Sequence, residues 1–181
     1  MCGRFIITDN NVFGLSYKPS FNITPSQYIP TKTENKSILM KWSYHTYWNN
    51  SNNLFNCRSE TMHMKPTFRN AKRCVIFNNG WYEWHSNQIG KTPYFLYSKT
   101  NYFAGLYNEG GCLILTRKSL DNIHHIHKRQ PVLLKENEIA IYLNGKNLFN
   151  SSANKEIYFH KISNKVNNTQ NNDSSLIVKE M

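Results

Sequence analysis

The middle of the chain is a series of short apolar segments separated by turns. This feature limits the possible folds of the sequence more than any other. RCVIFNNGWYEW at 73–84 predicts two strands joined by a turn at Asn78, Asn79 and Gly80. Strands are also predicted by the three segments that follow at short polar spacings, PYFLYS at 93–98, YFAGLY at 102–107 and CLILT at 112–116. Strands therefore dominate this region.

The rest of the chain adds strands and places helices between them. We predict strands at 4–8, 37–42, 131–134 and 157–162, helices at 59–71 (broken at Pro66), 118–127 and 136–145, and loops at 17–30 and 43–55. Strands that dominate, with helices segregated between them, indicate an α+β fold. We expect a mainly antiparallel sheet or barrel-like core with a few helices packed around it.

Length and composition indicate a single domain. A chain of 181 residues is long enough to bury a sizeable core, and it shows neither an internal repeat nor a clear linker. We therefore assign one domain to residues 1–166. The segment NNTQNNDSS at 167–175 is polar throughout, so 167–181 is predicted to be a flexible C-terminal tail.

The charge of the chain favours nucleic acid as a partner. Lys and Arg outnumber Asp and Glu by 22 to 11, which gives a formal net charge of +11. A charge of that size attracts polyanions, of which nucleic acid is the commonest. Aromatic residues make up 14% of the sequence and offer faces on which bases stack, which strengthens the same expectation.

Metal, membrane and secretion signals are absent from the sequence. No CxxC pair occurs, and the histidines at 124, 125 and 127 have no carboxylate or thiol beside them, so we expect neither a metal nor another cofactor. The start of the chain lacks a signal-peptide pattern, and no apolar stretch is long enough to cross a membrane. We expect an intracellular monomer with free thiols at Cys2, Cys57, Cys74 and Cys112.

Cys2 is the most reactive candidate, because removal of the initiator methionine would make it the first residue. An N-terminal cysteine carries a thiol and an α-amine on adjacent carbons. The amine attacks an aldehyde to give a Schiff base, and it titrates near ~7.7–8, so a useful fraction is neutral at physiological pH. The thiol of Cys2 then adds to the imine carbon and closes a five-membered thiazolidine, an intramolecular step that gains from proximity.

Motifs distributed almost end to end resemble those of a known family. The most specific are MCGRF at 1–5, NCRSETMHMKPTFR at 56–69 and RCVIFNNGWYEW at 73–84. FNITPSQ at 21–27, TPYFLY at 92–97, AGLY at 104–107, LILT at 113–116, IHKRQPVLL at 126–134 and KVNN at 165–168 complete the series in the same order. At these residues the chain resembles the SRAP (SOS response-associated peptidase) family.

The resemblance implies a covalent sensor of DNA damage. Members of the family crosslink through the N-terminal cysteine to abasic sites in single-stranded DNA, which shields the lesion. The peptidase activity in the family name refers to self-processing that exposes this cysteine and to a proposed reversal of the crosslink. Carried over by motif, the catalytic residues are Cys2, Asn56, Glu83 and His127, and the DNA-binding residues are Arg4, Arg58, Trp42, Trp84 and Arg129.

Each carried-over residue has a chemical role that suits its side chain. Asn56 would hold the N-terminal backbone and amine, Glu83 would assist proton transfers, and His127 would act as acid and base in ring opening and reversal. The three arginines would grip phosphates, and the two tryptophans would stack on bases.

The chain departs from the family pattern at several positions. The family usually has HDRMP where this sequence has HKRQP at 127–131, and WGLxPxW where it has WSYHTYW at 42–48. Cys57 stands where the family has another small residue, which raises the question of a second thiol beside the site.

Three alternative functions remain open from the residues alone. An N-terminal-nucleophile thiol peptidase would turn over peptides and would not need a basic surface. A non-covalent binder of single-stranded nucleic acid would bind in a salt-sensitive manner that is indifferent to Cys2. A structural relative with a different ligand is the third.

Overall fold

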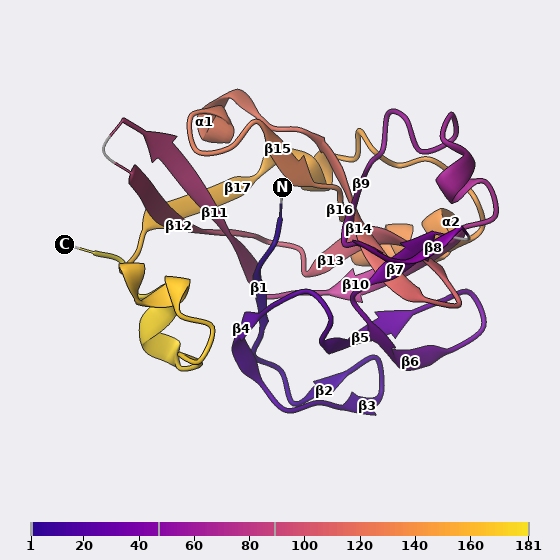
Figure 1. Cartoon of the computed structure of the whole chain (residues 1–181), viewed down its shortest axis with the longest axis horizontal. Helices are drawn as coiled ribbons and strands as arrows, with labels where there is room; N and C mark the ends of the chain where they lie inside the picture. The colour runs from indigo at the N-terminus through magenta and orange to yellow at the C-terminus, as the bar shows by residue number, and fades with distance from the viewer. Residues whose placement is uncertain (1, 47, 89, 181) are drawn as a thin grey trace.

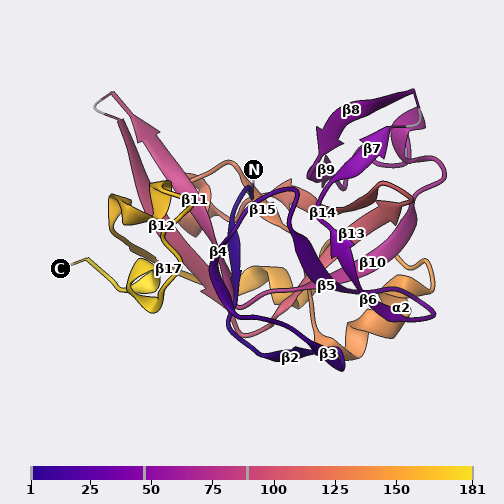
Figure 2. The ribbon, with the colours of Figure 1, turned by 60° about the horizontal axis from the view of Figure 1, so that its bottom comes forward.

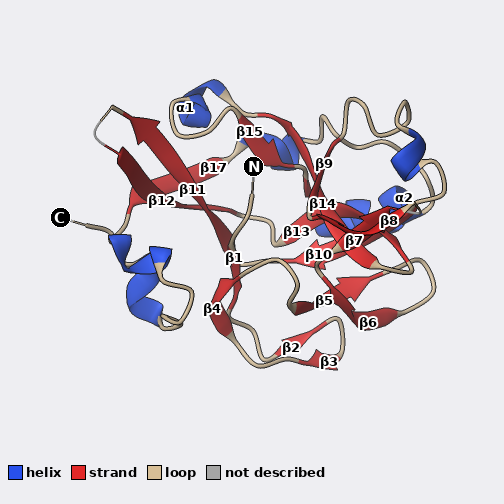
Figure 3. Cartoon of the chain, in the orientation of Figure 1, coloured by secondary structure: helices blue, strands red, loops and turns tan. Residues whose placement is uncertain are grey.

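Strands form most of the regular secondary structure, and most of them belong to two large sheets (Figures 1 and 3). The computed structural model describes residues 2–46, 48–88 and 90–180. The strand order of the first sheet is β17-β12-β11-β1-β4. Its strands are β1 (Phe5–Ile7), β4 (Ser20–Ile23), β11 (Gly80–Asn87), β12 (Gly90–Ser98) and β17 (Ile157–Lys161).

The second sheet is larger and has the strand order β15-β14-β13-β10-β5-β6. Two further strands pair at its margin, β16 with β13 and β9 with β14, and the β9 pairing is parallel. Its strands are β5 (Tyr28–Lys32), β6 (Ser37–Lys41), β9 (Asn56–Arg58), β10 (Lys72–Phe77), β13 (Tyr102–Asn108), β14 (Gly111–Lys118), β15 (Arg129–Pro131) and β16 (Leu133–Leu134).

Two small hairpins and several short helical turns complete the fold. The hairpins pair β2 (Asn11–Val12) with β3 (Leu15–Ser16) and β7 (Tyr44–Thr46) with β8 (Asn49–Leu54). The α-helices are α1 (Asp121–His124) and α2 (Ile139–Leu143), and 3₁₀ helices occupy Pro66–Phe68, Glu136–Glu138, Ser152–Lys155, Asn164–Asn167 and Ser174–Ile177.

The predicted α+β class with mainly antiparallel strands is confirmed. The segments at 73–84, 93–98, 102–107 and 112–116 form consecutive antiparallel strands, β10 to β14, as their pattern indicates. Within the described residues the strands form the two large sheets and the two hairpins, and no closed barrel.

The predicted turn between β10 and β11 links the two sheets. Gly80 adopts a φ of +145°, and a Cβ there would lie 2.9 Å from the Leu96 carbonyl oxygen, so the position requires glycine. The Asn79 side chain accepts from Thr8 N–H, and its backbone N–H donates to Ile6 O. The turn is thereby fixed against β1 and starts β11 in the register that carries Glu83.

Aromatic rings join the two sheets across the core. The Phe5 ring of β1 lies 4.9 Å from Trp42 and 5.9 Å from Phe103, and Phe103 lies 5.8 Å from Trp81 of β11. All four rings are buried. Burying such a side chain stabilises the fold by about 1.5–3 kcal/mol each, so this cluster fixes β1 and β11 against the second sheet.

The structure contains less helix than the sequence pattern predicts, and it contains strands where loops are predicted. Residues 59–71 form turns and one 3₁₀ helix, Pro66–Phe68. Their buried apolar side chains, Met62 and Phe68, are six residues apart and do not repeat at a helical period. The helix predicted at 118–127 shortens to α1. The segment 17–30, predicted as a loop, contains β4 and the start of β5.

The segment 43–55, also predicted as a loop, folds into the β7–β8 hairpin, with residue 47 outside the described part. Its polar β8 sequence carries little strand signal, so the pairing comes from the hairpin partner.

Residues 167–180 pack against the first sheet. The Asn172 side chain accepts from Phe21 N–H of β4 at 2.6 Å, and Leu176 is buried. In Figures 1 and 2 the segment lies beside β4, coloured yellow. A detached tail would not make these contacts. The domain boundary at 166 and the mobility of the segment stay predictions that hydrogen exchange would test.

Candidate active site

The first described residues lie where the two sheets meet. In Figures 1 and 2 the N-terminus sits between β11 on one side and β9 and β15 on the other. Cys2 is fully buried there, and its Sγ lies 3.8 Å from Arg4 O. Asn56, the first residue of β9, donates from its side-chain amide to Cys2 O at 2.7 Å. The candidate nucleophile is therefore fixed to the second sheet by one side-chain hydrogen bond.

The Cys2 thiol is held in its neutral form. Burial raises its pKa well above the usual value, and the negative charge of Glu83 raises it further. A buried thiol near a carboxylate has to lose its proton to an acceptor as it reacts, because the thiolate is disfavoured beforehand. The charge of Glu83 acts on this thiol, which makes Glu83 the candidate acceptor.

Glu83, whose charge acts on Cys2, lies side by side with His127. Glu83 sits in the middle of β11 opposite Tyr94 of β12 and is buried, and burial raises its pKa to about 7. Its Oε2 lies 4.0 Å from Nδ1 of His127, whose pKa is lowered from its usual value by burial. A carboxyl group that titrates near neutrality beside an uncharged imidazole is suited to proton transfer.

His127 is oriented by Arg129. Its Nδ1 accepts from the backbone N–H of Arg129 at 3.0 Å. The Arg129 guanidinium binds both carboxylate oxygens of Glu60, at 2.7 and 2.8 Å, and also donates to Thr116 O at 2.6 Å. Hydrogen bonding to Arg129 lowers the pKa of Glu60 to about 2. Glu60 and β14 thus fix the segment that carries the imidazole.

Comparison with known proteins identifies the family. A family model described as SOS response associated peptidase (SRAP) matches residues 1–169. The chain belongs to the SRAP family.

Similar proteins come from bacteria and animals. Abasic site processing protein YoqW of Bacillus subtilis is 30% identical, over 98% of this chain and 99% of that protein. Abasic site processing protein HMCES of Gallus gallus is 25% identical, over 90% of this chain and 66% of that protein.

Solved structures share the SRAP fold. A protein from Bacteroides thetaiotaomicron superposes with a TM-score of 0.72 at 20% identity, covering 89% of this chain and 85% of that one. A phage-related protein from Bordetella bronchiseptica gives 0.71 at 19% identity, covering 89% of this chain and 94% of that one. The fold described above is therefore shared with these solved structures.

The SRAP fold brings together the four residues that we predicted as catalytic. Asn56 contacts Cys2, the charge of Glu83 acts on the Cys2 thiol, and Glu83 neighbours His127. They come from four separate parts of the chain: the N-terminus, β9, β11 and the segment before β15. Their chemical roles stay predictions.

Two of the predicted DNA-binding residues lie on the opposite face of the first sheet. Side chains alternate along β11, so Trp81 and Glu83 face the shared core, while Tyr82 and Trp84 face the C-terminal segment. The Arg4 guanidinium lies over the Trp84 ring, 5.5 Å from its centroid. Arg4 and Trp84 thus form a pair beside the N-terminus but across the sheet from Glu83.

The other three predicted DNA-binding residues differ in accessibility. Trp42 is fully buried and donates from Nε1 to Phe55 O, so its ring belongs to the core and is not presented for base stacking. The Arg129 guanidinium is engaged by Glu60. Arg58 is exposed at the end of β9.

Cys57 faces away from the candidate site. It is buried in a cluster that includes Tyr44 and Met62, and not in the one that contains Cys2. Burial raises the pKa of the Cys57 thiol to about 12. The Cys57 thiol of this SRAP chain is therefore separated from Cys2.

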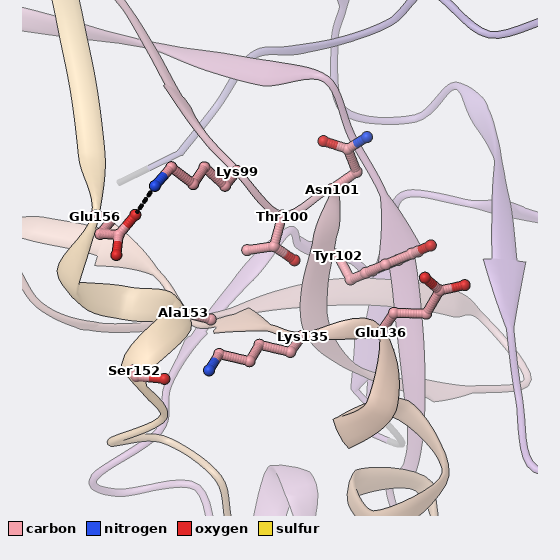
Figure 4. Close-up of a pocket in the computed structure, with 9 residues that line it drawn as sticks. All are labelled: Lys99, Thr100, Asn101, Tyr102, Lys135, Glu136, Ser152, Ala153 and Glu156. Carbon is pink, nitrogen blue, oxygen red and sulfur yellow. Dashed lines mark ion pairs between the residues drawn. The ribbon is translucent and has the colours of Figure 1, made fainter.

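A separate pocket of about 400 Å³ opens elsewhere on the SRAP fold (Figure 4). In Figure 4 an ion pair between Lys99 and Glu156, 2.8 Å long, lies along one side. The pocket is also lined by Thr100, Asn101, Tyr102, Lys135, Glu136, Ser152 and Ala153, and it includes no residue of the candidate site.

Across residues 2–46, 48–88 and 90–180, no group of three His, Cys, Asp or Glu side chains is placed to hold a metal ion. No helix in that part of the chain has the length and apolarity needed to cross a bilayer.

The sequence did not indicate the residues that hold the predicted site residues in place. Glu60 holds Arg129, while Asn22 and Asn167 contact Arg4 and Trp84. All three lie inside motifs that carry the family resemblance, NCRSET, FNITPSQ and KVNN. The signal was present, but the partners lie far apart along the chain, so the sequence alone could not assign a role.

Proposed function

We propose that this SRAP chain acts on abasic sites in DNA and captures them covalently through Cys2. Relatives that align over nearly the whole chain are named abasic site processing proteins. The observation that carries the proposal is the hydrogen bond from Asn56 to Cys2 O at 2.7 Å. It fixes the backbone of Cys2 beside a carboxyl group whose pKa is about 7.

The covalent step balances without an oxidant or cofactor. The sugar of an abasic site opens to an aldehyde, and the α-amine of Cys2, freed by removal of the initiator methionine, attacks its carbon. A C–N bond forms and one water leaves, which gives a Schiff base. The Cys2 sulfur then forms a C–S bond to the imine carbon, and the thiol proton ends on the nitrogen. The product is a thiazolidine.

Glu83 and His127 suit the proton transfers of this sequence. Glu83 accepts a proton from the α-ammonium group or the thiol, since its raised pKa matches physiological pH. His127 transfers a proton at the sugar oxygen during ring opening and during reversal of the crosslink. Its imidazole needs little tuning for this, since its pKa is lowered only from a value already near neutrality.

The basic surface supports a single DNA strand as the substrate. With a net charge of +11, the protein draws a polyanion toward its surface. The exposed Arg58 at the end of β9, next to Asn56, suits a phosphate that flanks the lesion. An unpaired strand suits this site, because the sugar has to reach a cysteine buried between two sheets.

A thiol peptidase is the second candidate. The family description includes peptidase, and a buried carboxyl group near a thiol would also serve an N-terminal nucleophile. This function predicts release of peptide products with turnover. Covalent capture predicts at most one DNA strand bound per protein.

A denaturing gel tests the proposal. Protein with confirmed loss of Met1 is mixed with a single-stranded oligonucleotide that carries one abasic site. Parallel lanes contain Cys2→Ser, Asn56→Ala and an intact oligonucleotide. We expect a heat-stable shifted band that requires Cys2 and the abasic site and forms at least several-fold more slowly in Asn56→Ala. Wild-type protein that gives no band would refute covalent capture, and binding that is indifferent to Cys2→Ser would support a non-covalent binder.

A further inference from the structure

The C-terminal segment, residues 163–180, packs against the first sheet near Arg4. Asn22 of β4 is buried, and its side-chain amide donates to Val166 O at 3.3 Å, Asn168 O at 3.2 Å and Asn171 O at 2.9 Å. Val166 is itself fully buried. The buried Asn22 side chain thus holds the C-terminal segment against the sheet by binding three carbonyl groups of that segment.

The same segment holds the Arg4 guanidinium. Arg4 donates to Asn22 Oδ1 at 3.0 Å, to Val166 O, and to Asn167 O at 3.5 Å. The side chain of Asn167 accepts from Trp84 Nε1 at 2.8 Å. Asn167 therefore touches both members of the Arg4–Trp84 pair, one through its backbone and the other through its side chain.

The acceptors around Arg4 are neutral, which distinguishes it from Arg129. Carbonyl and amide oxygens orient a guanidinium but leave its positive charge uncompensated. Arg129, in contrast, is neutralised by the carboxylate of Glu60 at 2.7 Å. Arg4 thus combines a fixed orientation with a full charge, and it is two residues from Cys2. These properties suit a residue that binds a phosphate group of DNA.

We propose that the C-terminal segment is part of the DNA-binding site, with Asn167 as a positioning residue for Arg4 and Trp84. It presents an ordered cation and an indole ring to the phosphate and base next to the captured sugar. The DNA would then pass around the N-terminus, with the lesion at Cys2 and its neighbour on the other face of the sheet. This inference rests on the proposed function for the identity of the ligand.

The test uses three exposed or partly exposed positions, so that the fold is retained. Asn167→Ala removes the acceptor for Trp84 Nε1, and Trp84→Phe removes the donor. Asn168→Ala is the matched control, because among the described contacts its side chain only accepts from the N–H of Gln170, two residues further along. Melting temperatures establish that each variant is folded.

Binding is measured by fluorescence anisotropy with a labelled, intact single-stranded oligonucleotide at several salt concentrations. We expect Asn167→Ala and Trp84→Phe each to raise the Kd by 3- to 10-fold. Their double variant should show little further loss, because both substitutions break one contact. The salt slope should stay near the wild-type value in these variants, whereas Arg4→Gln should lower it by about 0.7, the value for one phosphate on a single strand.

Two results would overturn the inference: an Asn167→Ala variant that binds like Asn168→Ala, or losses that multiply in the double variant. The covalent chemistry is scored separately with the abasic oligonucleotide. If wild type forms no crosslink but Asn167→Ala still weakens binding, the inference stands and the proposed function fails. If wild type crosslinks at a rate that Asn167→Ala does not change, and binding is also unchanged, only the inference fails.

Discussion

The guanidinium of Arg129 donates to both carboxylate oxygens of Glu60, at 2.7 and 2.8 Å, while its backbone N–H donates to Nδ1 of His127. One residue thereby connects the turn after β9 to the imidazole of the candidate site. Resemblance assigned Arg129 to a phosphate, whereas its contacts are those of a residue that positions His127. The two roles lead to different outcomes when Glu60 is changed.

Glu60→Gln should slow crosslinking by roughly 3- to 10-fold at neutral pH, because the charged two-point contact with Arg129 is lost and His127 is less firmly oriented. Single-turnover rates with the abasic oligonucleotide measure the effect. Glu34→Gln, in an exposed turn of the second sheet, is the control and should react like wild type. A Glu60→Gln variant with tighter DNA binding and an undiminished rate would instead indicate that Arg129 is released to grip a phosphate.

The rate of crosslinking should rise with pH through about 7. Burial raises the pKa of Glu83 to about 7, so its carboxylate, the proton acceptor, becomes populated over that range. Rates measured from pH 5.5 to 8.5 in wild type and Glu83→Gln test this. The variant should be slower by 10-fold or more, and it should lack the inflection that Glu83 provides. An identical inflection in Glu83→Gln would assign it to another group, such as the α-amine.

Glu83→Gln should stabilise the fold at alkaline pH. A carboxyl group with a raised pKa in the folded protein binds its proton more tightly there than in the unfolded chain. Protonation of Glu83 therefore stabilises the folded state, fully below the unfolded pKa of about 4.5. That contribution is lost as the pH rises through about 7. One pKa unit corresponds to about 1.4 kcal/mol, so the ionised group costs wild type about 3 kcal/mol at pH 8. Thermal melts at pH 5 and pH 8 should show the advantage of the variant growing with pH. A variant that is less stable than wild type at pH 8 contradicts this.

Cys57→Ala should leave the crosslinking rate within about two-fold of wild type. Its side chain packs in the cluster with Tyr44 and Met62, away from Cys2. Removing a buried sulfur should lower the free energy of unfolding by about 1 kcal/mol, by analogy with other small core truncations. Crosslinking kinetics and urea denaturation measure the two effects, and Cys74→Ala serves as a second buried-thiol control. A large loss of rate in Cys57→Ala alone would show that Cys57 takes part in the chemistry.

Local signals predicted the middle of the fold well. The strands β10 to β14 follow from short apolar segments separated by turns, and from the turn at Gly80, where a neighbouring carbonyl excludes any larger residue. β11 pairs with β12 and β13 with β14, as neighbours in the sequence, whereas β10 pairs with β13 across the intervening hairpin. The assembly of Cys2, Asn56, Glu83 and His127 came from motif resemblance and not from such patterns.

Long-range contacts explain what the sequence could not predict. Residues 59–71 look helical by composition, but Met62 and Phe68 are drawn separately into the core and no helix forms beyond the single 3₁₀ turn. Trp42 was assigned to DNA, yet its indole fills the space against Phe5 between the sheets. The polar sequence after 166 gives no sign that Arg4, at the other end of the chain, binds its carbonyl groups.

The parallel pairing of β9 with β14 has a chemical consequence. Asn56 pairs with Ile114 and Cys57 with Leu115, and side chains alternate, so a slip of one residue would exchange the two. Cys57 would then stand beside Cys2, where a second thiol could attack the same aldehyde or form a disulfide with the nucleophile. Hydrogen bonds from Ile114 to Phe55 and from Ser59 to Thr116 fix the register on both sides. The strand register therefore keeps the Cys57 thiol away from the proposed reaction at Cys2.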